Sequence, residues 1–328
     1  MSEAQYDVTA IGNAIVDVLT QASDKLLEQQ QLPKGTMSLI DEGAANRLYG
    51  LMGAGIEASG GSVANTAAGI AGLGGRTAFI GKVADDELGR VFQHDIRAVG
   101  VKFETPALKP PPSTARSLIF VTPDAQRTME TFLGACTMLT PDDVDDALIA
   151  ASAVVYLEGY LWDAPGGRDA FLKAARIAAR EGRKVAFTLS DPFCVDRHRE
   201  AFLDFVRDHV DILFANEHEI MSLYQVDEFD AAMHSIGQHV EIAALTRSEK
   251  GSVVVNRHEV HVIDAEPGVK VVDTTGAGDA YAAGFLYAYT HAKDLHTCAR
   301  LGGILAAEVI SHYGPRAETD LKQLAAKL

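Results

Sequence analysis

Residues 271–279 read Val-Val-Asp-Thr-Thr-Gly-Ala-Gly-Asp, and an apolar, alanine-rich segment, 280–289, follows them. The β-branched residues at the start predict a strand, and the segment after Asp279 predicts a helix. Gly276 and Gly278 lie between them and permit a close approach of the backbone to a ligand. A helix N-terminus behind such a loop favours anions, because its backbone N–H groups lack partners. The stretch therefore predicts a strand–loop–helix unit that binds an anion.

Asp279 is the polar side chain best placed for chemistry at this loop. Its carboxylate could accept a proton from a substrate hydroxyl, while the N–H groups of Gly276, Ala277 and Gly278 stabilise charge on a transferring phosphoryl group. An aspartate at a helix start is also an ordinary N-cap. The residues of this segment alone leave both roles open. A dinucleotide-binding fingerprint is excluded, because Tyr281 stands where the third glycine is required.

The charge of the chain narrows the classes of partner. The 328 residues include 29 Lys and Arg against 45 Asp and Glu, a formal net charge of −16. An acidic chain without a dense basic patch disfavours nucleic acids and anionic membrane surfaces. No uninterrupted apolar run reaches the roughly 18 residues of a membrane span, and the N-terminal residues lack a secretory pattern. We therefore expect a cytoplasmic protein that binds small molecules, with no nucleic-acid or membrane partner.

Strand-like and helix-like segments alternate beyond residue 140. The expected strands are 154–157, 185–189, 212–215, 242–245 and 253–255, with helices such as 168–180 and 217–224 between them. This alternation predicts a mainly parallel sheet with helices on both faces, which binds ligands at the carboxyl ends of its strands. Earlier β-prone pieces flank a proline run at 110–112. We expect a single α/β domain over 1–328 that carries a small inserted β-sheet lid, formed by about 15–40 and 107–132.

Polar residues also cluster near other expected element ends. Gly60 and Gly61 open a helix whose first turn carries Asn65, an arrangement that can present N–H groups and an amide to a polyhydroxy ligand or can simply form a tight turn. Asp17 follows the first strand and could bind two sugar hydroxyls or lie on the surface. Asn216 and Glu219 follow another strand. Their oxygens suit the hydration shell of Mg²⁺ beside a nucleotide, but their spacing also suits a capping box.

Taken together, Gly60-Gly61…Asn65, Asn216-x-x-Glu219 and Asp273-Thr-x-Gly-Ala-Gly-Asp279 resemble the ribokinase/PfkB-type family of carbohydrate and nucleoside kinases. The resemblance runs from Tyr6 to about Gly314. It implies a ribokinase-like three-layer α/β/α fold and an ATP-dependent kinase that uses Mg²⁺. It further implies Asp279 as the catalytic base, the amides of Gly276, Ala277 and Gly278 as the anion hole, and Asn216 and Glu219 as organisers of Mg·ATP, Glu219 acting through water.

The resemblance also assigns a nucleotide loop. Thr246 and Gly251 match the pattern T-x-G-x-x-G, although Ser248 replaces the middle glycine. Arg247 is then expected to assist with phosphate. Asp273 and Thr275 match residues that surround a monovalent cation such as K⁺ in many members. Separately, Arg116 or Arg127 on the expected lid could add a positive charge near the phosphates or could have only a surface role. Lids of this family either cap one site or pair between subunits, so a monomer and a homodimer both remain open.

The acceptor is indicated by a third set of positions. The resemblance is closest to the adenosine kinase branch, in which aromatic side chains sandwich a purine, and Phe193 matches one of them. Glu158 falls where sugar kinases place a carboxylate on the sugar hydroxyls. The implied substrate site comprises Asn13, Asp17, Gly60, Gly61, Asn65, Leu133, Ala135, Glu158 and Phe193. We expect phosphorylation of the primary (5′-type) hydroxyl of a nucleoside, with adenosine favoured. A kinase for ribose or fructose and a non-catalytic nucleotide- or nucleoside-binding sensor are the alternatives.

Overall fold

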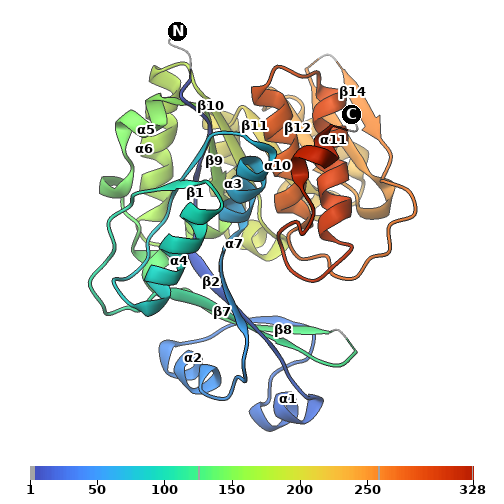
Figure 1. The fold of residues 1–328 in the computed structure, drawn as a ribbon. Helices are drawn as coiled ribbons and strands as arrows, with labels where there is room; N and C mark the ends of the chain where they lie inside the picture. The colour runs from blue at the N-terminus through green and yellow to red at the C-terminus, as the bar shows by residue number, and fades with distance from the viewer. Residues whose placement is uncertain (1–3, 125, 258, 327) are drawn as a thin grey trace.

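The computed structural model describes residues 4–124, 126–257, 259–326 and 328, and a large sheet forms its centre (Figure 1). The nine strands of this sheet are β1 (Tyr6–Ile11), β5 (Thr77–Ile80), β6 (Lys102–Phe103), β9 (Ser152–Glu158), β10 (Lys184–Thr188), β11 (Ile212–Asn216), β12 (Ile242–Thr246), β13 (Ser252–Asn256) and β14 (Val260–Ile263). Their order is β14-β13-β12-β11-β10-β9-β1-β5-β6. The pairs from β12 to β6 are parallel, and β13 and β14 are antiparallel. The predicted, mainly parallel sheet is confirmed.

Helices cover both faces of this sheet. Successive strand residues point to opposite faces, so Val154 and Tyr156 of β9 join one buried cluster and Val155 and Leu157 join another. The first face packs against α3 (Ser62–Leu73), α4 (Glu87–Ala98), α10 (Ala277–Thr290), α11 (Leu295–Val309) and α12 (Leu321–Ala325). The second packs against α5 (Asp146–Ala150), α6 (Gly167–Arg180), α7 (Pro192–His209), α8 (Glu217–Tyr224) and α9 (Phe229–Ile236). The three-layer α/β/α arrangement of the ribokinase-like fold is thereby confirmed.

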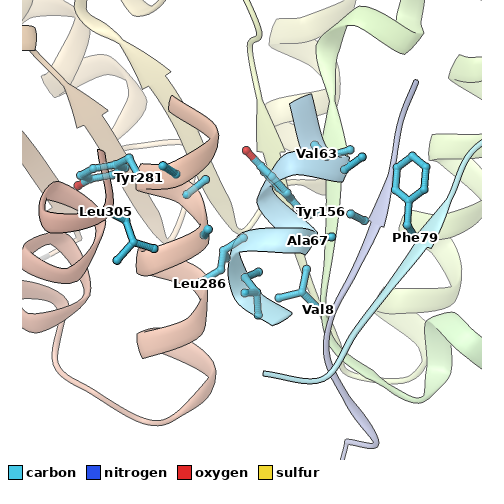
Figure 2. Close-up of a cluster of buried hydrophobic side chains, with 14 of the residues drawn as sticks. Val8, Val63, Ala67, Phe79, Tyr156, Tyr281, Leu286 and Leu305 are labelled. Carbon is cyan, nitrogen blue, oxygen red and sulfur yellow. The ribbon is translucent and has the colours of Figure 1, made fainter. Parts of the chain in front are cut away.

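Helix α3 lies between the sheet and α10, as Figure 2 shows for Val63 and Ala67 of α3 and Leu286 of α10. Small residues permit this close packing. A Cβ on Gly69 of α3 would lie only 2.7 Å from the Cβ of Ala283 in α10. The packing holds the N-terminal turns of α3 and α10 near each other.

A second, five-stranded sheet projects from the large one (Figure 1). Its strands are β2 (Ile15–Gln21), β3 (Met37–Leu39), β4 (Ile56–Gly60), β7 (Ala115–Val121) and β8 (Arg127–Phe132), in the order β3-β8-β7-β2-β4. Leu27 of α1 (Asp24–Gln30) and Leu48 of α2 (Glu42–Tyr49) are buried in the same cluster as Val16 and Val18. The small sheet is consistent with the expected lid, although β4 lies outside the predicted ranges.

Several boundaries differ from the sequence-based expectations. Helix α10 begins at Ala277 rather than at 280, and the strand expected at the start of 271–279 does not form, because this stretch has no strand partner in the described sheet. Short 3-10 helices occur at η1 (Gly134–Met138), η2 (Pro141–Asp143), η3 (Gly159–Asp163) and η4 (Ser248–Lys250). Within the described residues, no helix combines the length and apolar character needed to span a bilayer.

Candidate active site

Four of the parallel strands of the large sheet carry sequence-predicted residues at the edge from which the small sheet projects. Asn13 follows β1, Glu158 ends β9, Asn216 ends β11 and Thr246 ends β12. Because these strands run in parallel, their carboxyl ends lie along one edge. Open α/β sheets bind ligands at this edge. The fold therefore places these sequence-predicted residues along one side of the molecule.

Asp279 lies in the first turn of α10 and is not its N-cap, because Gly276 occupies that position with a φ of +78°. The Asp279 carboxylate instead accepts hydrogen bonds from the hydroxyl of Ser62 (2.7 Å) and from the amide Nδ2 of Asn65 (3.3 Å). Burial raises the pKa of Asp279 to about 6, although these two bonds and the charge of Arg316 lower it in part. The capping alternative is wrong, and the carboxylate is a stronger base than an exposed aspartate.

The glycine loop before Asp279 is confined on one side and open on the other. A Cβ at Gly276 would lie 2.6 Å from the Cα of Pro315, and its positive φ also requires glycine. At Gly278 the corresponding space is open, with no described atom within 4 Å. The N–H of Ala277 donates to the carbonyl of Thr274 (3.2 Å), so this amide is already engaged. The open side at Gly278 is where a ligand could approach the start of α10.

Asp17 projects from β2 on the face opposite Val16 and Val18, which join the buried cluster. Its carboxylate lies directly against Gly60, where any Cβ would overlap it. Burial, with a smaller effect from the charge of Asp279, raises the pKa of Asp17 to about 6, even though Arg316 and Arg127 lower it. The structure thus brings Asp17 and Asp279 into one electrostatic environment.

Arg316 is a site residue that sequence reasoning missed. Its Nε donates to Oδ1 of Asn65 (3.1 Å), its Nη1 to Asp95 (3.1 Å) and its Nη2 to the hydroxyl of Ser59 (2.8 Å). It therefore orients the side chain that contacts Asp279 and ties β4 to α4. Ser62 was also not named as a site residue, although it directly follows Gly60 and Gly61, which were. For Arg316, the one local signal was its position after a Gly-Pro turn.

Asp273 is saturated by partners within the protein. One oxygen accepts from the N–H (3.0 Å) and hydroxyl (2.7 Å) of Thr275, and the other accepts from the N–H of Gly314 (3.0 Å) and pairs with Nη1 of Arg127. The guanidinium already neutralises the carboxylate. This arrangement does not fit the expected monovalent-cation site.

The two lid arginines lie on different faces of the small sheet. Nη2 of Arg116 donates to the side chain of Asn46, and its guanidinium lies 5.6 Å from the ring centroid of Tyr49, so it faces α2. The expectation that Arg116 contacts phosphate is therefore wrong for this arrangement. Arg127 lies on the same face as Asp17. Its Nε and Nη2 are buried and have no hydrogen-bond partner among the described residues.

Asn216 and Glu219 form a capping box, which was the alternative to a magnesium-binding role in the sequence analysis. Oδ1 of Asn216 accepts from the N–H of Glu219 (2.8 Å), and Oε2 of Glu219 accepts from the N–H of Asn216 (2.9 Å). Glu219 is buried, and burial raises its pKa to about 7. The ion pairs found in the described part of the chain include none to Glu219. A buried carboxylate without a cationic partner fits a magnesium ion held through water.

No cluster of three or more His, Cys, Asp or Glu side chains suited to a metal occurs among the described residues. A magnesium ion held at this edge would keep most of its water and would bind to phosphates. The described residues do not form a cluster of side chains that could coordinate a metal ion directly.

The predicted nucleotide loop follows β12. Gly251 has a φ of +80°, and a Cβ there would overlap the carbonyl of Ile263, so the loop requires glycine. Arg247 pairs with Glu217 (2.7 Å), and its guanidinium stacks 3.9 Å from the ring centroid of Phe229. This engagement differs from the expectation of a phosphate-directed Arg247. Thr246 lies beside Asn216 in the sheet register, so these two predicted nucleotide contacts are adjacent.

The predicted acceptor residues differ in their exposure. Phe193 is 75% exposed in the first turn of α7, whereas Ala135 is buried and Leu133 is partly buried. Glu158 is fully buried, and its carboxylate accepts from the N–H groups of Asn13 (2.7 Å) and Val63 (3.1 Å). Its oxygens therefore face the backbone rather than an open cleft, which differs from the expected sugar contact.

Comparison with known proteins agrees with this geometry. Residues 53–321 match the model of the pfkB family carbohydrate kinases. The chain belongs to the pfkB family. As a pfkB kinase it is an ATP-dependent phosphotransferase that acts on a hydroxyl group.

Relatives of this pfkB kinase include proteins named for both acceptor classes. The crystal structure of adenosine kinase from Sinorhizobium meliloti is 52% identical, covers 99% of each chain and superposes with a TM-score of 0.91. That of a probable sugar kinase from Rhizobium etli CFN 42 is 49% identical, with a TM-score of 0.92, over 99% of this chain and 98% of that one. An uncharacterized sugar kinase from Archaeoglobus fulgidus is 30% identical over 76% of this chain and 96% of its own. The resemblance to the adenosine kinase branch is supported.

Proposed function

We propose that this pfkB kinase transfers the γ-phosphoryl group of ATP to the 5′-hydroxyl of adenosine, with Asp279 as the general base. The observation that carries the proposal is the placement of Asp279. Its carboxylate has a raised pKa, is held by Ser62 and Asn65, and stands at the N-terminus of α10. A carboxylate with a pKa near 6 remains ionised at neutral pH and takes up a proton more readily than an exposed one.

The acceptor is proposed to lie between the lid and the first turn of α3. Asp17, which lies against Gly60, offers two carboxylate oxygens to the ribose hydroxyls, and Gly61 and Asn65 are assigned to the same site. Because glycine has no side chain, the sugar can approach the backbone at this turn. The exposed ring of Phe193 is available to stack on a purine. Asn13 and the 133–135 turn complete the proposed site.

Proton transfer and charge stabilisation are assigned to neighbouring groups on α10. Asp279 takes the proton of the 5′-hydroxyl as its oxygen attacks the γ-phosphorus. The N–H groups on the open side of the first turn, at Gly278, stabilise the charge on the transferring phosphoryl group. Closure of the small sheet excludes water, which limits the wasteful hydrolysis of ATP. Ser62 and Asn65 keep the carboxylate oriented during this step.

ATP is proposed to lie along the carboxyl edge near Thr246 and Gly251, with Arg247 beside it. Asn216 and Glu219 would hold the water shell of a magnesium ion, which supplies positive charge to the phosphates when bound. Arg127 is the lid cation that the geometry favours, because two of its side-chain nitrogens are buried without hydrogen-bond partners in the described part of the chain. We place this reaction in the cytoplasm, where ATP is supplied.

An assay of ADP release over a panel of acceptors tests this proposal. Adenosine should support turnover, whereas ribose and fructose should not. Turnover with a free sugar alone would favour the sugar kinase, a reading that the probable sugar kinase from Rhizobium etli supports. ADP release at background level with every acceptor would favour a non-catalytic sensor.

A further inference from the structure

Two of the chain segments that join the lid to the large sheet pass over the same side chain. Residues 12–14 connect β1 to β2, and Gly61 connects β4 to α3. Glu158, the last residue of β9, lies beneath both segments and is fully buried. A single carboxylate therefore contacts two of the segments about which the lid would move.

Each oxygen of this carboxylate has a different backbone partner. Oε1 accepts from the N–H of Asn13 at 2.7 Å, and Oε2 accepts from the N–H of Val63 at 3.1 Å. Gly12 is packed against the same group, because a Cβ there would lie 2.5 Å from the Glu158 carboxyl carbon. Gly61, with a φ of +102°, lies against the carbonyl of Asn13. The two segments thus contact each other as well as Glu158.

The position of Val63 gives the contact a second consequence. Val63 lies in the first turn of α3, where a helix leaves its N–H groups without internal partners. The N-cap residue is Gly61, which has no side chain that could cap this turn. A carboxylate at a helix N-terminus also interacts favourably with the helix dipole. Glu158 therefore supplies the missing partner of the turn that carries Ser62 and Asn65.

We propose that Glu158 is a positioning residue that sets the relative placement of Asp17 and Asp279. Through Asn13 it fixes the start of β2, which carries Asp17, and through Val63 it fixes the turn whose Ser62 and Asn65 orient Asp279. The inference rests on the proposed function, since it concerns the acceptor and the base of that reaction. Glutamine cannot replace Glu158, because its amide NH₂ would face a backbone N–H that needs an acceptor.

Kinetics of Glu158→Gln test this role. We expect kcat to fall by about 10- to 100-fold, because small misplacements of reacting groups cause rate losses of this size. The KM for ATP should be unchanged. Glu181→Gln, at an exposed glutamate that caps the end of α6, is the matched control and should retain wild-type kinetics. A wild-type kcat in Glu158→Gln would overturn the proposal.

Acceptor analogues separate positioning from direct contact with a sugar hydroxyl. Positioning predicts the same fold-loss for adenosine, 2′-deoxyadenosine and 3′-deoxyadenosine. Direct contact predicts that Glu158→Gln loses markedly less with the analogue that lacks the contacted hydroxyl, and this result would also overturn the proposal.

Amide hydrogen exchange tests the same contact without turnover. The amides of Asn13 and Val63 should exchange faster in Glu158→Gln and at the wild-type rate in Glu181→Gln. If Glu158→Gln does not fold, amide exchange in the wild-type protein tests the contact instead. Its Asn13 and Val63 amides should be protected like those of β1, and free exchange there would contradict the contact. A wild-type protein that turns over no nucleoside would reject the proposed function, yet the exchange result would still stand or fall by itself.

Discussion

The hydroxyl of Ser62 donates a 2.7 Å hydrogen bond to the carboxylate of Asp279, and 217 positions of sequence separate the two residues. The bond joins the first turn of α3 to the first turn of α10. It lowers the pKa of Asp279 against the opposing effect of burial. The contact thus contributes to both the orientation and the basicity of the proposed catalytic carboxylate.

Ser62→Ala is expected to lower kcat and to move the acidic limb of the pH–rate profile toward higher pH. Without the hydroxyl, the carboxylate loses a bond that favours its ionised form. A hydrogen bond to a charged group contributes about 1.5–3 kcal/mol, so we expect kcat to fall by roughly 10- to 100-fold. Ser62→Thr keeps the hydroxyl and serves as the control. An unchanged pH profile in Ser62→Ala would contradict the role of this bond.

The activity of the wild-type protein should fall below about pH 6. Asp279 must be ionised to accept a proton, and burial places its pKa at about 6. Below that value kcat should fall by about tenfold per pH unit, because the ionised fraction does so. Steady-state rates measured between pH 5 and 8 check this limb. A rate that stays level down to pH 5 would mean that another group accepts the proton.

Asp279→Asn is expected to raise the stability of the protein above pH 7 while it removes activity. The folded-state pKa of about 6 exceeds the ordinary 3.8, so the ionised carboxylate costs free energy in the folded state at high pH. This cost disappears as the pH falls below the ordinary value, since Asp279 is then protonated in both states. We expect a gain of about 1 kcal/mol at pH 8. Thermal unfolding at pH 8 and at pH 4 measures it, and a loss of stability at pH 8 would refute it.

The buried pair Arg127–Asp273 should show strong coupling. Both side chains are 7% exposed, so removing one partner leaves the other charge buried and unpaired. Arg127→Met and Asp273→Asn should each cost about 3 kcal/mol in the free energy of unfolding, and the double variant should cost less than their sum. The exposed pair Arg207–Asp204 is the control, whose variants should lose much less stability because solvent screens both charges. Denaturant unfolding of the wild-type protein, the two single variants and the double variant measures this coupling. Additive losses in the free energy of unfolding would exclude it.

Local sequence patterns were sufficient for most of the large sheet and for the helix after the glycine loop, but they wrongly predicted a strand before that loop. The alternation of strand-like and helix-like segments predicts β9 to β13, and the glycine loop predicts the N-terminus of α10, whereas β6 and β14 were not predicted. Strand β4 was not predicted because Ile-Glu-Ala-Ser-Gly has little β propensity, and its pairing with β2 decides its structure. Helix α1 has only seven residues, too few for a clear period.

The polar contacts of the site could not be read from the sequence. Arg316 and Asn65 are 251 positions apart, and Arg127 and Asp273 are 146 apart. Such pairs depend on how the lid and the C-terminal segment pack, which no local pattern encodes. The partners of Glu158 are backbone N–H groups, which every residue except proline possesses. Its side-chain type was therefore compatible with either a substrate contact or a buried structural role.

ADP release by the wild-type protein and by Asp279→Asn, with adenosine and with 5′-deoxyadenosine, tests most directly whether Asp279 activates the 5′-hydroxyl. The wild-type protein should turn over adenosine and leave 5′-deoxyadenosine unphosphorylated. Asp279→Asn should bind both ligands, as measured by calorimetry, yet lose about 10²- to 10⁴-fold in rate. A wild-type rate in Asp279→Asn, or equal ADP release with the two acceptors, would contradict this role.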